Sequence, residues 1–336
     1  MKYASEFLTR GLLLETKYRK KDFSYGKGKY LEFVFLCGKA SQPNDNRDQL
    51  TRKIIEKQTF RYSLYSEKTF HAFTSSGLDL LTVEEVLADI SSKIVIIVES
   101  YGSACELGAF SLLDDGLSKL LVINDIKHKG ENSFIELGPL TKIRRKTLDK
   151  GVLYESFTGE DICFSPGLVN SIDEIRRSGF KRKIFTEEPE VEPRQMAIND
   201  LACLTCLVFE YVVRFGYLRK SNVLNAVNWL AQNVNELPLV ARLSSNNMLD
   251  ESETREAVYA IPVILTELGL FATADHRGES YYRLGTRISN DHPVDLNRLS
   301  GLIFHGIFSR STEIRKLTSK IRNCACKEGF QLWEEA

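Results

Sequence analysis

The sequence predicts an α/β fold built on a parallel sheet with helices on both faces. Two observations carry this prediction. The runs Tyr30–Cys37 and Lys93–Val98 are almost continuously apolar, as strands covered on both faces are. Between such runs lie segments whose apolar residues recur at helical spacing, such as Leu81–Ser91. Crossovers between parallel strands are right-handed, so repeated strand–helix units leave few arrangements other than a parallel sheet.

Strands and helices alternate through the first half of the chain. Gly38 ends the first strand, and Asn46-Arg47-Asp48 can cap the helix that follows. A glycine-containing loop over 99–103 opens a helix that runs to about 113. This order predicts a Rossmann-like, flavodoxin-like sheet. The predicted strands are 30–37, 61–65, 93–98, 119–123 and 152–154, and the other predicted helices are 46–58, 81–91 and 134–146.

Composition divides the chain into two domains. We expect an α/β domain over residues 1–158, a helical connector and linker over 159–195, and a mainly helical domain over 196–336. Phe185–Gln195 has two prolines among four glutamates, which argues against a helix or strand there. After it, helix patterns cover 198–218, 221–234, 251–268 with a break at Pro262, and 293–308. Two short strands over 271–284 turn at Arg277-Gly278, so the last domain is predicted to be a winged helix-turn-helix.

Charge and cysteine content narrow the class of protein. The 45 basic residues balance the 45 acidic residues, so the protein has no net charge that would attract it to nucleic acid or to a membrane surface. No apolar run approaches the ~20 residues of a membrane-spanning helix, and Met1–Phe23 lacks the apolar core of a secretion signal, so we expect a soluble cytoplasmic protein. Cys203-x-x-Cys206 and Cys324-x-Cys326 could together bind zinc. The first pair lies in an apolar helix pattern, where cysteine packs as a small hydrophobe, and we expect no metal.

The segment Glu99–Phe110 carries the candidate chemistry, because a doubly wound sheet binds its ligands beyond the carboxyl ends of its strands. Gly102 allows close backbone approach to a ligand, and the hydroxyls of Ser100 and Ser103 can bind a sugar or phosphate. Glu106 follows Ser103 by three residues and shares its helix face. Its carboxylate could attack a sugar's anomeric carbon or activate water. The alternative is a first-turn glutamate that only complements the helix dipole.

Three motifs that occur together in a known family follow one another along the chain. They are Phe35-Leu36-Cys37-Gly38, then Glu-Ser-x-Gly-Ser-x-x-Glu-Leu-Gly-Ala-Phe from Glu99, then Ser133-Phe134-Ile135-x-x-Gly138-Pro139. Over roughly residues 30–156 the chain resembles retron-associated effectors with a nucleoside deoxyribosyltransferase-like domain, and its second half resembles their winged-helix portion more loosely. The resemblance implies that Glu106 is the catalytic carboxylate. It also implies a substrate pocket lined by Cys37, Gly38, Ser100, Gly102 and Ser103, with Glu67 as a further pocket candidate.

Some positions depart from the pattern of these effectors. Tyr101 stands where relatives often have proline, and Ser66 replaces the proline before Glu67. Ordinary deoxyribosyltransferases have an aspartate near Glu99, so we expect sugar recognition to differ here. Asn124, at the end of the fourth predicted strand, is a substrate-contact candidate with helix capping as the alternative.

The resemblance also implies a role. Such a protein is a toxin of an anti-phage system acting by abortive infection, restrained by a reverse transcriptase and its RNA-linked DNA (msDNA), within a higher-order assembly. Its implied reaction is hydrolysis of the nicotinamide–ribose bond of NAD, which is substrate and not cofactor. The alternatives are base exchange or hydrolysis on other nucleotides, and a nucleotide-sensing DNA-binding regulator. The basic run Lys142–Lys146 could contact nucleic-acid phosphates or form a solvated helix face.

Overall fold

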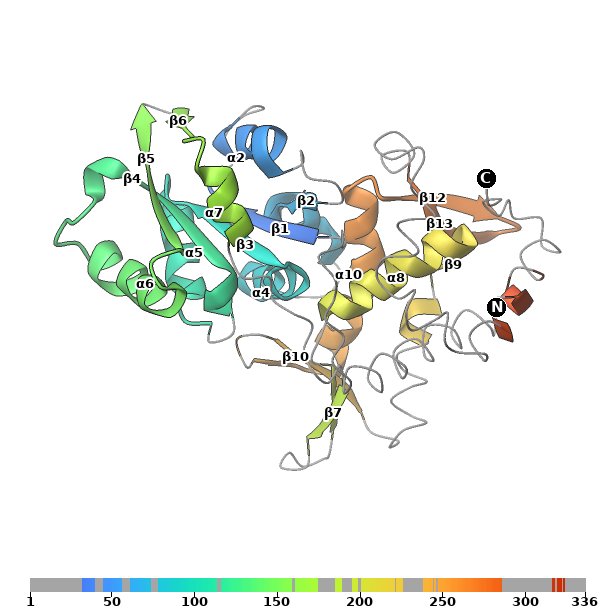
Figure 1. Ribbon diagram of the computed structural model, residues 1–336. Coiled ribbons are helices and arrows are strands. Elements are labelled where there is room, and N and C mark those ends of the chain that lie inside the picture. Colours follow the sequence, from blue (N-terminus) through green and yellow to red (C-terminus); the bar gives the residue numbers. More distant parts are fainter. Residues whose placement is uncertain are drawn as a thin grey trace.

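The structure is a computed structural model. It describes residues 32–39, 45–55, 61–73, 78–113, 116–158, 161–174, 185–188, 195–198, 201–220, 222–225, 238–243, 245, 247–285, 316–317, 319–321 and 323. Its main element is a six-stranded sheet in the order β2-β1-β3-β4-β5-β6 (Figure 1). The first five of these strands are parallel, and β6 joins antiparallel at the edge. The strands are β1 (Glu32–Cys37), β2 (Arg61–Leu64), β3 (Lys93–Ile97), β4 (Leu120–Asp125), β5 (Val152–Thr158) and β6 (Asp161–Cys163).

The five predicted strands and the parallel sheet are therefore confirmed, while β6 was not expected. Strand residues alternate between two apolar clusters. On one face, side chains such as Val34 and Val95 pack with Leu50 and Leu168. On the other face, side chains such as Phe35 and Ile94 pack with residues of further helices, among them Val86, Leu107 and Ile261. Burial on both faces explains why these strands read as unbroken apolar runs.

Short helices connect the strands. Helices α2 (Asn46–Leu50) and α7 (Leu168–Glu174) contribute to the first cluster, and α4 (Leu80–Ile90), α5 (Tyr101–Phe110) and α6 (Thr141–Thr147) contribute to the second. The predicted cap of α2 was one residue late, because the side chain of Asp45 accepts from the Asp48 amide at 2.9 Å. The shorter turns are η1 (Thr51–Ile55), α3 (Ser66–Thr69), η2 (Phe70–Phe73), η3 (Gly116–Lys119), η4 (Ile126–His128) and η5 (Glu136–Leu140).

The buried face of α4 differs from the predicted one. Leu81 was expected on the apolar face but is 51% exposed, because it lies in the first turn of the helix, beyond the sheet-facing residues. Val83, Val86 and Leu87 are buried as predicted. Glu84 shares that buried face, with only 5% of its surface exposed. A carboxyl group is thus carried into the interior by an otherwise apolar helix.

The prediction that residues 185–195 hold no strand was wrong, because one strand lies in this segment and a second begins at its last residue, Gln195. Strands β7 (Phe185–Glu188) and β8 (Gln195–Ile198) pair antiparallel, and β8 also pairs parallel with β10 (Leu239–Arg242). β11 (Met248–Leu249) completes a four-stranded sheet. The two prolines of this segment, at positions 189 and 193, belong to neither strand and lie outside the described residues.

A three-stranded antiparallel sheet in the order β12-β13-β9 lies near the end of the described chain. β12 (Phe271–His276) and β13 (Glu279–Leu284) form the predicted hairpin. Its tip is Arg277-Gly278, both with positive φ, as a tight two-residue turn requires. The third strand, β9 (Tyr217–Arg219), was predicted as helix; α8 (Leu201–Phe215) ends before it at Gly216, whose φ is 77°.

Helix α10 (Glu251–Glu267) runs through Pro262 without the predicted break. Pro262 is buried together with Ile261 and Leu265, and packing on this face keeps the helix continuous despite one missing amide donor. Of the predicted helix over 221–234, residues 222–225 are helical and 226–234 lie outside the described residues. The predicted helix over 293–308 also lies outside them.

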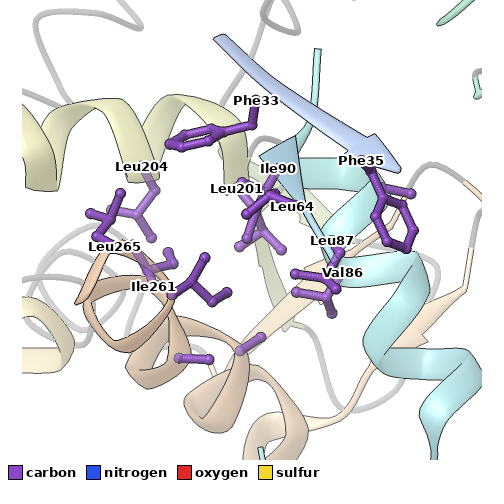
Figure 2. Packing of buried hydrophobic residues seen from close by; sticks show 14 of the residues in the cluster. Phe33, Phe35, Leu64, Val86, Leu87, Ile90, Leu201, Leu204, Ile261 and Leu265 are labelled. Atoms are coloured by element: carbon purple, nitrogen blue, oxygen red, sulfur yellow. The ribbon is translucent and has the colours of Figure 1, made fainter. Parts of the chain in front are cut away.

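One apolar cluster joins the two halves of the chain. Figure 2 shows side chains of β1, α4, α8 and α10 pointing toward one another, among them Phe33, Leu87, Leu204 and Ile261. Helix α8 contacts α4, and α10 contacts η2 and α3. The predicted boundaries at 158 and 195 remain a prediction, but residues on both sides of them share a core.

Candidate active site

The site is built at the start of α5, directly after β3. Ser100 caps the helix by accepting from the Ser103 amide at 3.1 Å, and the Ser103 hydroxyl accepts from the amides of Ser100 and Glu99 at 3.0 and 3.1 Å. This reciprocal capping satisfies amides that a helix start otherwise leaves free. The expected loop over 99–103 is thus mostly the first turn of a helix. Ser103 is only 1% exposed, so capping is its observed role, and substrate contact by the two serines remains a prediction.

Glu106 lies one turn further along α5. Its Oε2 is buried and receives no hydrogen bond from any described N–H or O–H group. Its carboxyl group instead meets that of Glu84, and two carboxyl groups can hydrogen-bond only if one carries a proton. Burial, followed by the negative charge of Glu84, raises the pKa of Glu106 to about 8. Glu106 is therefore mainly protonated in the empty site at neutral pH.

Glu84 was not among the predicted site residues. Its burial raises the pKa of its carboxyl group, while hydrogen bonds with Ser66 and Glu106 act in the opposite direction. The sequence carried a signal for it, since Glu84 precedes Leu87 by three residues and therefore lies within the apolar face of α4. A carboxyl group in such a position is either paired or functional.

A guanidinium group lies beside these carboxyls. Arg47 Nη1 is 2.6 Å from Glu67 Oε1, and Arg47 also approaches Asp45 at 3.5 Å. The Arg47 guanidinium sits over the Tyr65 ring, 5.2 Å from its centroid. Both Glu67 and Arg47 act electrostatically on Glu106. The predicted residues Glu67 and Glu106 are thus close enough to interact electrostatically, and Arg47, which sequence reasoning missed, acts on Glu106 and pairs with Glu67.

Glu99 braces the segment after β1. Its Oε1 accepts from the Lys39 amide at 2.9 Å, and its Oε2 accepts from Asn46 Nδ2 at 2.7 Å. Asn46 Oδ1 in turn accepts from the Ile162 amide of β6 at 3.0 Å. These bonds lower the pKa of Glu99, but burial is the larger effect and leaves that pKa raised. Glu99 therefore ties β1, α2 and β6 to the start of α5.

Gly38 is required by this bracing. A Cβ at position 38 would lie 2.9 Å from Glu99 Oε1 and 3.1 Å from the Arg47 side chain. Gly102, by contrast, is exposed in the first helical turn, and a Cβ there would meet only Ser100 Oγ, at 3.7 Å. Close packing explains the first glycine, and approach of a ligand remains the predicted reason for the second.

The remaining predicted residues lie at the same carboxyl edge of the sheet. Cys37 ends β1 and is buried; burial, followed by the charge of Glu106, raises the pKa of its thiol, so it is no thiolate nucleophile at neutral pH. Asn124 is buried near the end of β4, the neighbour of β3. The adjacent Asp125, and not Asn124, caps the following turn by accepting from the Lys127 amide at 3.1 Å.

Neither a metal site nor a membrane span is found in the described part of the chain. No group of three His, Cys, Asp or Glu side chains there could bind a metal ion. Cys206 is buried, and Cys324 and Cys326 lie outside the described residues. No described helix has the length and apolarity needed to cross a membrane.

The fold and site define an α/β protein with a cluster of carboxyl groups at the carboxyl edge of a parallel-rich sheet. Residues 43–250, more than half of the chain, match the family described as STM3845 retron effector protein, and the chain belongs to this family. Two Escherichia coli proteins are similar to it. The "Retron Ec73 putative ribosyltransferase/DNA-binding protein" is 30% identical over 155 residues, 43% of this chain and 48% of that protein. The "Retron Ec86 putative ribosyltransferase/DNA-binding protein" is 34% identical over 172 residues, 50% of this chain and 54% of that protein. The chain thus matches about half the length of each relative.

Proposed function

We propose that this retron effector is an N-glycosidase that hydrolyses the nicotinamide–ribose bond of NAD, as the toxin of an anti-phage defence system. The observation that carries the proposal is the Glu106 carboxyl group, partly buried at the start of α5 and facing a buried acidic partner. The term ribosyltransferase in the names of both relatives supports chemistry at a ribose anomeric carbon.

The strand order supports this assignment. The parallel strands follow the order β2-β1-β3-β4-β5, which is that of a flavodoxin-like, Rossmann-like sheet. In that arrangement the order reverses between β1 and β3, and ligands bind beyond the carboxyl ends of the strands at this point. Cys37 ends β1 and the Glu106 helix follows β3, so the carboxyl cluster lies where such a sheet binds substrate.

The charges of the site favour NAD over other nucleotides. The cluster combines the carboxyl groups of Glu67, Glu84 and Glu106 with the guanidinium of Arg47, so even with one carboxyl group protonated these four side chains carry a net negative charge. The nicotinamide ring of NAD is cationic while bound to ribose, and it leaves as a neutral molecule. Breaking the C–N bond sends its electron pair to the ring nitrogen, and water adds to the anomeric carbon with release of one proton. No general acid is needed, whereas most nucleosides require protonation of the leaving base.

Glu106 supplies the anionic oxygen in this reaction. Once ionised, its carboxylate either attacks the anomeric carbon or accepts the proton of the attacking water, and in both cases it stabilises the oxocarbenium-like transition state. Glu67 and Arg47 border this position, and we assign Cys37, Gly38, Ser100, Gly102, Ser103 and Asn124 to the pocket around it.

The C-terminal part is proposed to be a winged-helix module. Its sheet order β12-β13-β9, with α8 before β9 and α10 before the hairpin, is the arrangement expected of a winged helix. Arg277 lies at the tip of the hairpin and Arg283 is exposed on β13. The words DNA-binding protein in the names of both relatives favour docking to nucleic acid. This is also the observation that keeps a DNA-binding regulator as a second candidate function.

We propose the retron reverse transcriptase and its msDNA as partners that restrain the enzyme. A hollow of about 460 Å³ between η3 and α6 is lined by Lys142, Arg145 and Lys146, which would suit phosphate groups. Reversing the charge at Lys142 and Arg145 should weaken msDNA binding and reduce its dependence on salt concentration. Equal binding by the variant and the original protein would remove this surface from the proposal.

The proposed activity is tested by incubating the protein with NAD, alone and with reverse transcriptase and msDNA, and measuring nicotinamide release. Glu106→Gln should abolish release. The matched control is Glu85→Gln, because Glu85 is on α4 next to Glu84 but bonds to Ser245 and Asn247 instead. Release that survives Glu106→Gln, or no release in any of these mixtures, would contradict the proposal. Added free base distinguishes hydrolysis from exchange, since an exchange enzyme would form a new nucleotide with it.

A further inference from the structure

Among the described residues, neither Glu84 nor Glu106 forms an ion pair with a cation. Arg47, whose charge acts on Glu106, is paired with Glu67 at 2.6 Å. Glu106 Oε2 is shielded from water and accepts no described hydrogen bond, and Glu84 is 95% buried on the opposing helix. Two ionised carboxylates in such contact would repel without the screening that water provides. A proton between them converts the repulsion into a short, charge-assisted hydrogen bond.

We infer that Glu84 and Glu106 share one proton while the site is empty, and that Glu84 is the positioning residue that sets when Glu106 becomes ionised. The inference deepens the proposed function and rests on it for its catalytic meaning. The shared proton itself follows from the contact of the two carboxyl groups. The roles differ because Glu106 is partly accessible at the start of α5, whereas Glu84 is enclosed and hydrogen-bonded to Ser66.

The groups facing this pair come from several elements. Glu67 of α3 adds negative charge and favours keeping the proton, while Arg47 of α2 opposes it. Cys37 of β1 is neutral, since burial raises the pKa of its thiol. Burial raises the pKa of Glu84 as well as that of Glu106, so it favours protonation of both carboxyl groups. Among the described residues the balance therefore favours a singly protonated pair.

A shared proton links ionisation of Glu106 to the charge of the substrate. A cationic ring beside the pair stabilises the doubly ionised form, so binding expels the proton to solvent and leaves Glu106 anionic against the anomeric carbon. A neutral nucleoside provides no such charge and leaves Glu106 protonated. Glu84 thereby makes the enzyme respond to N-glycosides with a cationic leaving group, without itself touching the substrate.

Infrared difference spectroscopy tests the shared proton without any need for activity. The carbonyl stretch of a protonated carboxylic acid should be present at pH 7 in the original protein and absent from Glu106→Gln, and it should disappear as the pH rises through about 8. In Glu84→Gln the midpoint should fall by about 1 pH unit or more, because a neutral amide replaces the neighbouring carboxylate. In Glu85→Gln, whose side chain bonds elsewhere, the midpoint should not move.

Catalysis provides the second readout. The acid limb of kcat/KM for NAD should shift to lower pH in Glu84→Gln and stay in place in Glu85→Gln. No protonated-acid band in the original protein, or an unchanged midpoint in Glu84→Gln, would overturn the inference even if NAD is cleaved. If the band behaves as described but NAD is not cleaved, the shared proton stands and the proposed function fails.

Discussion

Replacing Glu106 by glutamine should stabilise the protein, and by an amount that grows with pH. The pKa of Glu106 is raised from 4.5 to about 8 by burial and by Glu84, so the folded protein binds this proton more tightly than the unfolded chain does. The stabilisation is fully present below pH 4.5 and is lost as the pH rises from there to about 8. At about 1.4 kcal/mol per pH unit, the full loss amounts to about 5 kcal/mol. Glutamine keeps the shape of the side chain without the charge, so the variant escapes this loss.

Urea unfolding of Glu106→Gln and the original protein, run side by side at several pH values, measures the effect. The two proteins should differ little in stability at pH 5, and the variant should become the more stable one as the pH rises, by a few kcal/mol at pH 9. Glu85→Gln, which alters a carboxylate of the same helix as Glu84 that bonds to Ser245 instead, is the matched control variant. A stability difference independent of pH, or a variant less stable than the original at pH 8, would refute the reasoning.

Three other predictions concern the scaffold of the site. Gly38→Ala should lower the free energy of unfolding by about 1–3 kcal/mol, because its Cβ would lie 2.9 Å from Glu99 Oε1. Gly108→Ala should raise it by up to about 1 kcal/mol, because a Cβ there would meet nothing within 4 Å and alanine favours the helix. Thermal unfolding of both variants should show these opposite shifts. Asn46→Ala should cost about 1–3 kcal/mol in urea unfolding, since the partly buried Glu99 carboxylate loses a donor at 2.7 Å; an unaltered midpoint would disprove the bracing role. Leu204→Ala should cost about 2–5 kcal/mol and reduce amide protection in β1 as well as in α8, whereas a loss confined to α8 would argue against a shared core.

The elements that could be predicted are those whose burial or turn geometry requires a recognisable pattern of residues. β1 and β3 are covered on both faces and read as apolar runs, and the hairpin over 271–284 carries an Arg-Gly turn with the required positive φ values. β7 has no apolar pattern of this kind, because Glu187 and Glu188 are polar and the strand is formed by pairing with β8. The break predicted at Pro262 was wrong for the opposite reason, since packing of the buried face of α10 outweighs the tendency of proline to interrupt a helix. Long-range pairing and packing decided both cases.

The residues of the candidate site likewise fall into those that a sequence motif indicates and those that only the fold brings to the site. Glu106 belongs to a contiguous motif and was proposed from it, and Glu67 was proposed from the resemblance to the effectors, in which a proline precedes the corresponding position. Arg47 and Glu84 were missed because they reach the site from α2 and α4, and only the fold brings these helices to α5. The serines were identified from the motif, but Ser103 serves to cap the helix on which Glu106 stands.

The most direct test of the account is the structure of Glu106→Gln with NAD bound. The substitution removes the carboxylate that we propose to be reactive but keeps the shape of the side chain, so NAD should remain intact in the site. We predict that the anomeric carbon of the nicotinamide ribose lies within about 3.5 Å of the side chain at position 106, with the cationic ring toward Glu84 and Glu67. NAD bound elsewhere, or bound with its adenine end beside α5, would contradict the account.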